Sequence, residues 1–381
     1  MGIKNLTEFL RNKFPQIFKT VHISEYHYKK VAIDISLYMN VFIHRFARRT
    51  SKPGSKVVVE CRKQDWIPGF IDLVATLRKN EVHCIFIYDT KAPVEKTVER
   101  EKRTASKDKM ENTSQELQDS LDNYYETKEI SKFLLDFQER RNLGQKSLIS
   151  NNNLNIKGIE LALETMLKNL VRPTKADYEI SKKLFDLLDI PYLDAFMEAE
   201  TLCCDLCIQG EVDAVLSKDT DVLAYGAPIF LTDINTRTET CTKIEYKDLL
   251  NEMELTSDEF LDFCIMCGTD YNDNIPKVGP VKAYALIKQY GSIEHIGRQT
   301  GLNISILNHK RVREMFRNYP KYTKKISYCG IPKFSELEQF LFKNNVRIDH
   351  DYLESSFVRK FIIEDEIENE IENEDDIIIE D

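Results

Sequence analysis

The sequence predicts an α/β fold in which a mostly parallel, twisted sheet carries helices on both faces and an all-helical region follows. Between residues 31 and 233, short segments rich in β-branched residues alternate with stretches of helical periodicity, and no hairpin signal joins neighbouring strands. Beyond Leu255 the periodicity is helical throughout. Alternation followed by a purely helical stretch indicates a sheet-based core with a helical region appended to it.

The first half of the chain supplies three helix patterns and two strands. Residues 1–14 carry apolar side chains at helical spacing and predict an amphipathic helix. Residues 31–36 (VAIDIS) predict the first strand, and residues 37–49 predict a helix that ends in basic side chains. Residues 66–79 predict another helix, and residues 83–89 (HCIFIYD) predict the second strand.

Three more strands complete the predicted sheet. Residues 156–188 have helical periodicity, and residues 191–195 predict the third strand. Residues 212–217 follow a turn at Gly210 and predict the fourth strand. Residues 228–233 (PIFLTD) predict the fifth.

The helical region contains one short motif and one basic segment. Residues 258–267 predict a helix, and two short helices are expected to flank the turn at residues 277–280. Residues 308–325 hold 7 Lys or Arg residues against the single acid Glu314. Residues 334–361 predict one or two further helices.

Two stretches lack any core pattern. Residues 91–109 hold 7 basic and 4 acidic residues, and the polar composition continues to about residue 153. Composition alone therefore predicts a solvated, partly disordered insertion, although a long insertion after an active-site strand is also typical of a lid. Residues 364–381 hold 11 acidic residues and no basic residue, which predicts a disordered tail.

The net charge of −10 comes from this tail. Without its 11 acids, 52 acidic residues face 53 basic ones, so the body of the protein is almost neutral. A near-neutral body with local basic patches can bind nucleic acid despite an acidic pI. No apolar run has the length of a membrane span, so no membrane is expected as a partner. Nine scattered cysteines indicate free thiols in a reducing, intracellular compartment.

Three aspartates, Asp34, Asp89 and Asp219, lie at or near the C-terminal ends of predicted strands. Any one of them alone is better explained as a turn or N-cap residue. In parallel strands, however, these ends meet at one edge of the sheet, where α/β proteins build their sites. Three acids at equivalent ends therefore predict a cluster of carboxylates.

A second set of acids surrounds the fourth predicted strand. Glu198 and Glu200 precede it, and Asp221 follows Asp219. A spacing of two residues does not place both glutamates on one helix face, so one of them is expected to act from the non-helical cap or through water. Crowded carboxylates repel one another unless cations lie between them, and hard oxygen donors favour Mg²⁺ or Mn²⁺. The set suits a two-metal phosphodiester hydrolase.

Two further motifs have ordinary structural explanations. The turn around Gly279 and Lys282 (IPKVGPVKA) looks like a helix–hairpin–helix whose backbone N–H groups bind phosphate, but it could equally be a plain helix–helix turn. Cys264 with Cys267, and the cysteines at 203, 204 and 207, have spacings that suggest zinc. Because they lie within apolar helix patterns, we predict that they pack in the core instead.

Six motifs occur together in the order and spacing of one known family: MGI, VAIDIS, FIYDTKAP, IPYLDAFMEAE, LSKDTDVLAYG and CGTDYNDNIPKVGPVKA. From residue 1 to about residue 300 the chain resembles the flap endonuclease branch of the structure-specific 5′-nuclease superfamily, which has a PIN-like core. The resemblance extends weakly to residue 361. The chain departs from the family in its longer insertion, its acidic tail and Asn40, where an aromatic residue is usual. These departures indicate a viral or otherwise divergent member.

The resemblance implies two Mg²⁺ ions, replaceable by Mn²⁺, that are held by seven carboxylates. Asp270 enters the set only through the resemblance. The expected ligands are Asp34, Asp89, Glu198, Glu200, Asp219, Asp221 and Asp270.

The resemblance also implies a helical arch after the second strand, in which Lys96 and Arg103 activate the scissile phosphate. Gly279 and Lys282 are expected to bind the duplex, with K⁺ near their turn, and we assign further DNA contacts to Gly2 and Tyr38. The predicted regions are nuclease core at 1–90 and 154–254, arch at 91–153, helix–hairpin–helix at 255–300, C-terminal helices at 301–363 and tail at 364–381.

The sequence therefore predicts a metal-dependent 5′ nuclease that cuts DNA at 5′ flaps, nicks or ends during replication, repair or recombination. Its expected substrate is a branched or nicked duplex with a 5′ single strand. The protein is expected to act as a monomer, in the nucleus or at a cytoplasmic viral replication site. No sliding-clamp peptide is recognisable at the C-terminus, so clamp binding is not expected. Two alternatives remain, a catalytically idle scaffold that binds DNA junctions and a ribonuclease of the same fold.

Overall fold

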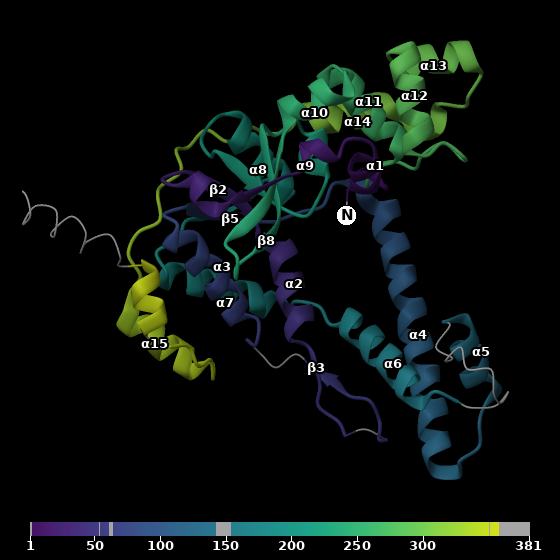
Figure 1. The fold of residues 1–381 in the computed structure, drawn as a ribbon, viewed down its shortest axis with the longest axis vertical. Helices are drawn as coiled ribbons and strands as arrows, with labels where there is room; N and C mark the ends of the chain where they lie inside the picture. The colour runs from purple at the N-terminus through teal and green to yellow at the C-terminus, as the bar shows by residue number, and fades with distance from the viewer. Residues whose placement is uncertain (1, 53, 61–63, 142–153, 350, 358–381) are drawn as a thin grey trace, which may run out of the picture. The chain divides into compact units, whose positions relative to one another are not determined.

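The computed structural model describes residues 2–52, 54–60, 64–141, 154–349 and 351–357, shown in Figure 1. Three predictions concern residues outside these ranges: the acidic tail, the end of the last predicted helix, and the C-terminus to which the clamp prediction refers. No helix within the described ranges is long and apolar enough to cross a membrane.

One mixed sheet forms the centre of the fold, with the strand order β1-β9-β8-β7-β2-β5-β6. The strands from β8 to β6 in this order run parallel, whereas β9 is antiparallel to β8 and β1 is antiparallel to β9. The prediction of a mostly parallel sheet is therefore confirmed. The strand bounds are β1 Lys19–His22, β2 Lys30–Asp34, β5 His83–Tyr88, β6 Tyr192–Asp194, β7 Ala214–Leu216, β8 Ile229–Asn235 and β9 Thr240–Glu245.

The expectation that no hairpin is present was wrong, because β8 and β9 form one. Strand β9 reads TCTKIE, and only Cys241 and Ile244 of it are buried. The strand lies near the sheet edge, where most of its side chains stay partly in water, so it lacks the apolar run by which the interior strands were recognised. Edge strand β1 was missed for the same reason.

Strand β2 marks the point where the chain changes direction across the sheet. It pairs with β5 on one side, where Val31 lies opposite Cys84, and with β7 on the other, where Val31 lies opposite Ala214. The chain first builds β2, β5 and β6 outward, and then returns to add β7 and β8 on the opposite side. In open α/β sheets, the carboxyl ends of strands at such a reversal form the crevice in which ligands bind.

Helices cover both faces of the sheet, and the side chains of β5 show the alternation. Ile85 and Ile87 face a core that α1 (Leu6–Lys13), α8 (Ala199–Ile208) and α11 (Ser257–Cys267) share. Phe86 points to the opposite face, where its ring stacks on Phe185 of α7 (Lys175–Leu187) at 4.1 Å. Phe70 of α3 (Ile67–Lys79) packs edge-on against both rings.

The regular elements beyond Leu255 are helices, as predicted, and the unpredicted helix α10 precedes them. A capping box between Thr256 and Glu259 begins α11, and Gly268, with φ +96°, ends it. The eight cysteines that the structure describes are buried free thiols, and those of α8 and α11 pack in the core, as predicted. The helices are α10 Tyr246–Met253, α11, α12 Pro280–Tyr290, α13 Ile293–Thr300, α14 His309–Arg317 and α15 Phe334–Lys343.

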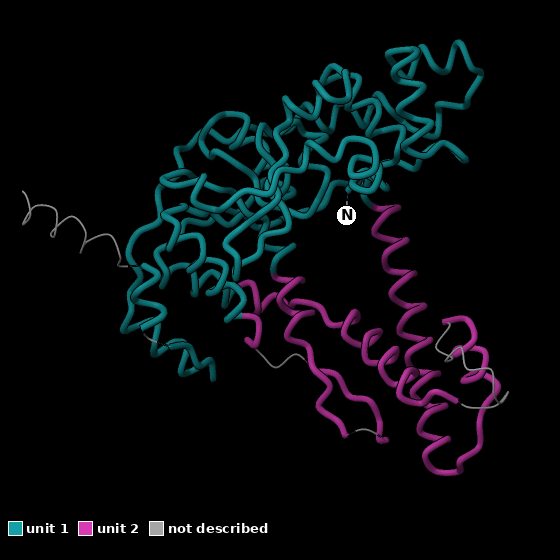
Figure 2. The backbone as a smooth tube through the Cα atoms, viewed as in Figure 1, with its two compact units in different colours: residues 1–38, 67–96, 179–381 teal, residues 39–66, 97–178 magenta. Residues whose placement is uncertain are grey.

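The contacts divide the chain into two compact units, coloured separately in Figure 2. Unit 1 comprises residues 1–38, 67–96 and 179–381 and contains the sheet. Unit 2 comprises residues 39–66 and 97–178. It contains α4 (Thr97–Thr127), α5 (Lys132–Arg140), α6 (Ile156–Leu170) and a ribbon of β3 (Arg48–Arg49) and β4 (Val59–Glu60). Helices α2 (Ile35–Phe46) and α7 pass from one unit to the other.

Residues 97–127 form one helix of 31 residues, although composition alone indicated partial disorder there, and residues 97–109 are almost all exposed. Few of them are apolar, but Leu117 and Leu121 are buried in the unit 2 core with residues of α5 and α6. Side chains four residues apart also pair along the helix, for example Arg103 with Glu99 at 3.1 Å. Residues 142–153 of the predicted insertion lie outside the described residues.

Candidate active site

Three of the predicted acids lie where neighbouring parallel strands end. Asp34 is the last residue of β2, Asp89 follows β5 directly, and Asp219 follows β7 by three residues. Because β2 lies between β5 and β7, with all three parallel, these residues share one edge of the sheet. This edge belongs entirely to unit 1.

Asp34 both caps a helix and contributes to the cluster. Its Oδ1 accepts hydrogen bonds from the backbone N–H groups of Ser36 at 2.8 Å and Leu37 at 3.4 Å, at the start of α2. The N-cap explanation is therefore correct, but it is incomplete. The carboxylate is buried, and burial raises its pKa well above the usual value. The neighbouring carboxylates of Asp89 and Asp219 raise that pKa further.

The two glutamates occupy different positions at the start of α8. Glu198 is the N-cap residue with an extended backbone, whereas Glu200 lies in the first turn. The structure thus places one glutamate in the cap, as the spacing predicted. The N–H of Ala199 donates to Asp89 Oδ1 at 2.7 Å, which fixes the beginning of α8 against the end of β5. Desolvation raises the pKa of Glu200 well above its usual value, followed by repulsion from Asp34 and Asp219.

Asp219 and Asp221 begin the short helix α9 (Asp221–Ala224). Asp219 Oδ1 accepts from the N–H of Asp221 at 3.0 Å. Burial raises the pKa of Asp221 well above its usual value, and Asp219, Asp270 and Glu198 raise it further. The buried Oδ1 of Asp221 has no hydrogen-bond partner among the described residues.

Gly2 lies directly against this pair. A Cβ at position 2 would meet Asp219 Oδ1 at 2.1 Å and the backbone nitrogen of Asp221 at 2.8 Å, and the backbone has φ +78°. Only glycine fits under both constraints. Gly2 therefore contacts the acidic cluster, and its predicted contact with DNA stays a prediction.

Lys96 places a positive charge among the acids. Its Nζ lies 2.6 Å from Glu198 Oε1 and 3.4 Å from Asp270 Oδ2, and its side chain is 12% exposed. Burial by itself lowers the pKa of the ammonium, but Glu200, Glu198 and the nearby aspartates outweigh this effect and raise the pKa above its usual value. Lys96 thus balances part of the negative charge.

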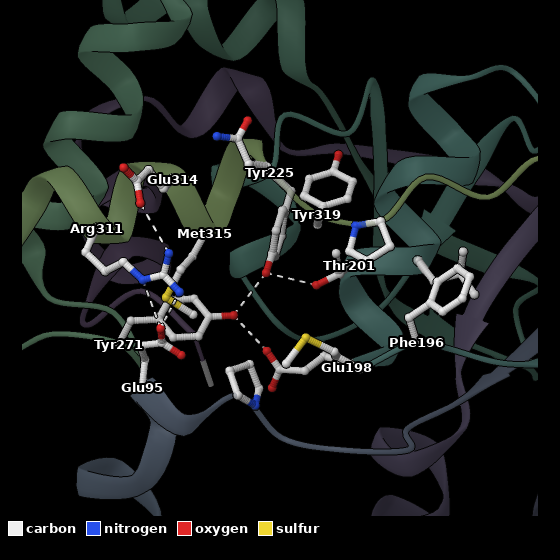
Figure 3. A pocket seen from close by; sticks show the side chains of 15 residues that line it. Glu95, Phe196, Glu198, Thr201, Tyr225, Tyr271, Arg311, Glu314, Met315 and Tyr319 are labelled. Atoms are coloured by element: carbon white, nitrogen blue, oxygen red, sulfur yellow. Dashed lines mark hydrogen bonds and ion pairs between the residues drawn. The ribbon is translucent and has the colours of Figure 1, made fainter.

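Three hydroxyl groups form a chain of hydrogen bonds that ends on Glu198 (Figure 3). Tyr271 donates to Glu198 Oε2 at 2.7 Å, because a carboxylate only accepts. Because the Tyr271 proton is used in that bond, Tyr225 must donate to the oxygen of Tyr271, at 3.0 Å. Thr201 in turn donates to the oxygen of Tyr225, also at 3.0 Å. The whole chain is therefore polarised toward the carboxylate.

Sequence reasoning missed this chain. Tyr225 lies in the LSKDTDVLAYG motif and Tyr271 beside Asp270 in the CGTDYNDNIPKVGPVKA motif, but neither had been assigned a role, and Thr201 lies outside the six motifs. The three hydroxyl groups are brought together only by the packing of α8 and α9 against residues 268–271.

Four predicted site residues remain, Arg103, Tyr38, Gly279 and Lys282. Arg103 belongs to unit 2, on α4, where its guanidinium pairs with Glu99. Tyr38 is 2% exposed, so its ring offers no face to solvent for stacking on a nucleotide. Gly279 is the N-cap of α12, and the space where a side chain would stand is open. Lys282 is exposed in the first turn of that helix.

The donors at the sheet edge suit a hard divalent cation. All seven acids offer oxygen, burial and then mutual repulsion raise the pKa values of several, and a buried oxygen of Asp221 lacks a hydrogen-bond donor among the described residues. No three His, Cys, Asp or Glu side chains in the described ranges already stand in metal-coordinating geometry. The ammonium of Lys96 lies between Glu198 and Asp270, so ions can be held only if these side chains readjust.

Comparison with solved structures supports the fold. The catalytic core of Rad2 in complex with a DNA substrate aligns with a TM-score of 0.62 and 16% identity, covering 94% of this chain and 99% of that one. Flap endonuclease-1 from Methanococcus jannaschii aligns with a TM-score of 0.58 and 20% identity, covering 91% and 97%. This likeness shows that the chain shares the α/β fold of these two proteins.

Comparison with known sequences identifies the family. The XPG N-terminal domain matches residues 1–110, and the XPG I-region matches residues 189–270. The protein named "Probable RAD2-like endonuclease 369L" of Invertebrate iridescent virus 6 is 32% identical over 94% of this chain and 92% of its own length. Flap endonuclease 1 of Zea mays is 30% identical over 78% of this chain and 69% of its own length. The chain belongs to the XPG family of structure-specific 5′ nucleases and is a nuclease of DNA processing.

Proposed function

We propose that this nuclease uses two Mg²⁺ ions to hydrolyse phosphodiesters in branched or nicked DNA that carries a 5′ single strand, and that it acts as a monomer. One observation carries the proposal. Carboxylates from distant parts of the chain meet at the carboxyl ends of the strands around β2, where the chain reverses its direction across the sheet. Burial and mutual repulsion raise the pKa values of several of them. Such an arrangement is costly without cations, and it recurs in two-metal hydrolases.

The seven acids would share the work of holding the ions. Asp34, Asp89 and Glu200 would form one side and Asp219, Asp221 and Asp270 the other, with Asp219 close enough to repel Asp34 and Glu200 as well. When bound, two such ions supply a hydroxide nucleophile at neutral pH and stabilise the leaving oxygen, and Mn²⁺ can replace Mg²⁺ in this chemistry. Glu198, with its two oxygens on Lys96 and Tyr271, would complete the set.

Lys96 would change partners during the reaction. Cations at the acids would remove the charge that now holds its ammonium at Glu198. The freed ammonium would then bind a non-bridging oxygen of the scissile phosphate, where negative charge develops. Arg103, on the helix of unit 2 that follows Lys96 in the chain, would supply a second cation to the same phosphate.

The duplex would bind at the start of α12. Gly279 leaves the first backbone N–H groups accessible, and Lys282 is exposed one turn into the helix. Both features favour a phosphate at a helix N-terminus. We also propose that K⁺ binds near this turn. Gly2 and Tyr38 would contact the DNA, and Tyr38 would first have to become exposed.

A cleavage assay tests the proposal. Purified protein with Mg²⁺ is given labelled 5′-flap DNA, the same flap in RNA and a blunt DNA duplex. The proposal expects cleavage of flap DNA at the junction, with little cleavage of the other two. Preference for the RNA flap would make the chain a ribonuclease of the same fold. Tight binding of flap DNA without cleavage would make it a scaffold.

A further inference from the structure

A cavity of about 210 Å³ lies beside the acidic cluster, within unit 1 (Figure 3). Glu198 belongs to both, so an occupant of the cavity would lie next to the site proposed for hydrolysis. The lining includes several aromatic and thioether side chains, notably Phe196, Tyr225, Tyr271, Met315 and Tyr319, beside charged and polar ones. The proposed catalytic mechanism uses the hydroxyl group of Tyr271 but none of these ring faces or thioethers.

The walls of the cavity are held in place from behind. Phe316 packs against the rings of Tyr225 at 4.7 Å and Tyr271 at 5.4 Å. The hydroxyl groups of the same two tyrosines are fixed by the chain of hydrogen bonds that ends on Glu198. Tyr319 packs edge-on against Tyr225 at 5.7 Å. The rings therefore form a preorganised surface, which lowers the entropic cost of binding a flat ligand.

The size of the cavity restricts the ligand. Pockets for drug-sized molecules measure about 300–1,000 Å³, so a cavity of about 210 Å³ has room for one small ring system. Rigid aromatic faces and a thioether favour a planar, polarisable ring, which stacks on such surfaces. Asn318 and Thr201 add an amide and a hydroxyl group to the lining, which suit the polar edge of a base.

The charges around the cavity exclude an anion. Three carboxylates line it, from Glu95, Glu198 and Glu314. The single lining cation, Arg311, already contacts Glu95 at 2.6 Å and Glu314 at 3.2 Å. Lys96 pairs with Glu198 from outside the lining, so three carboxylates face two cations. A phosphate in the cavity would meet this net negative charge, whereas a neutral ring would not.

We propose that this cavity binds one unpaired nucleobase of the DNA substrate, from a nucleotide next to the scissile phosphate. The proposal rests on the proposed function, because the position of the scissile phosphate is inferred from the acidic cluster to which Glu198 belongs. Phe196, which is 61% exposed, would cover one side of the base, and Met315 would contact its other side. Holding the base would pull its nucleotide out of the duplex and keep the adjacent phosphate at the acids.

The test uses a set of fluorescent 5′-flap duplexes, each with one abasic tetrahydrofuran residue, stepped one nucleotide at a time across the junction. Affinities are measured by anisotropy with Ca²⁺ in place of Mg²⁺. The proposal expects one position at which loss of the base weakens binding about tenfold, the typical effect of losing one stacked base. Phe196→Ala and Met315→Ala should bind intact DNA more weakly and lose the sensitivity at that position.

Phe342→Ala is the matched control, since Phe342 is 86% exposed on α15 and does not line the cavity. It should keep the wild-type pattern. The inference is overturned if no position is sensitive, or if both cavity variants retain the full abasic effect. Cleavage of unmodified flap DNA in Mg²⁺ is measured alongside. Failure to cut would overturn the proposed function, while the abasic series separately reports on the cavity.

Discussion

The ammonium nitrogen of Lys96 lies 2.6 Å from Oε1 of Glu198, in the midst of carboxylates proposed to bind two metal ions. A lysine in this position neutralises the acids while cations are absent. Lys96 also lies close enough to reach a phosphate at this site once bound cations neutralise the acids in its place.

Replacing Lys96 with methionine should lower both stability without metal and catalysis with it. The acids would lose their compensating charge, so the melting temperature in EDTA should fall and the rise on adding Mg²⁺ should be larger than in the wild type. Cleavage of flap DNA should fall about 100-fold or more, as when a transition-state donor is removed. Lys182→Met, which removes an exposed pairing with Asp194, is the control and should change neither. An unchanged metal response in K96M would contradict the charge-balancing role.

Tyr271→Phe tests the chain of hydroxyl groups. It removes the donor to Glu198 Oε2 and keeps the packing of the ring against Phe316. A hydrogen bond to a charged group contributes about 1.5–3 kcal/mol. We therefore expect the Mg²⁺ concentration for half-maximal cleavage to change, measured together with cleavage at saturating Mg²⁺. Tyr246→Phe, which removes a hydroxyl contact to Ser257, should leave the Mg²⁺ dependence unchanged. Equal effects of the two variants would show that Tyr271 has only a structural role.

The pH dependence of stability follows from the raised carboxyl pKa values. A carboxyl group whose pKa is higher in the folded than in the unfolded protein binds more protons when folded. The free energy of unfolding should therefore fall as pH rises above about 4, the unfolded value for aspartate, toward the raised folded values. In EDTA, the melting temperature should be higher at pH 5.5 than at pH 7.5, and Mg²⁺ should reduce the difference.

Asp221→Asn should reduce this dependence, because it removes one of the buried carboxyl groups with a raised pKa. The control is Glu252→Gln, at an exposed position of α10. Melting curves of both variants at the two pH values, with and without Mg²⁺, decide the matter. A wild-type slope in D221N would mean that mutual repulsion at the sheet edge does not govern the stability.

Lys282→Ala should weaken DNA binding and reduce its salt dependence. Each neutralised phosphate contributes about 0.9 to the slope of log affinity against log salt, so the slope should fall by about one. Lys29→Ala is the control, because Lys29 is exposed just before β2, at the opposite end of the strand from Asp34. Binding of a flap duplex is measured between 50 and 200 mM salt, in the range where such slopes are determined. An unchanged slope would exclude a phosphate contact by Lys282.

The sheet core and its acids could be predicted because local patterns encode them. Strands β2, β5 and β7 are short β-rich runs, and the acids at their ends are neighbours in space once the strands are parallel. Asp270 is different. It follows the end of α11 rather than a strand, so strand logic alone gave no reason to select it, and the family motif did.

Other features depend on tertiary packing that the sequence does not display. Strand β9, second from the sheet edge, carries mixed polar side chains, because only Cys241 and Ile244 of it are buried. Helix α4 looked disordered, because its stability comes from pairs four residues apart and a few leucines that meet α5 and α6. Tyr38 was expected at the DNA, but its ring is buried, since α2 packs against the core on that side. The bonds from Thr201 through Tyr225 to Tyr271 join residues far apart in sequence.

The central claim is that the seven carboxylates form one metal-dependent catalytic centre, and Asp219→Ala tests it most directly. Cleavage of labelled 5′-flap DNA in Mg²⁺ is measured beside binding of the same DNA, with Asp233→Ala on β8 as the control. The account predicts that Asp219→Ala binds the flap but no longer cuts it, whereas Asp233→Ala does both. Cleavage by Asp219→Ala at the wild-type rate would contradict it.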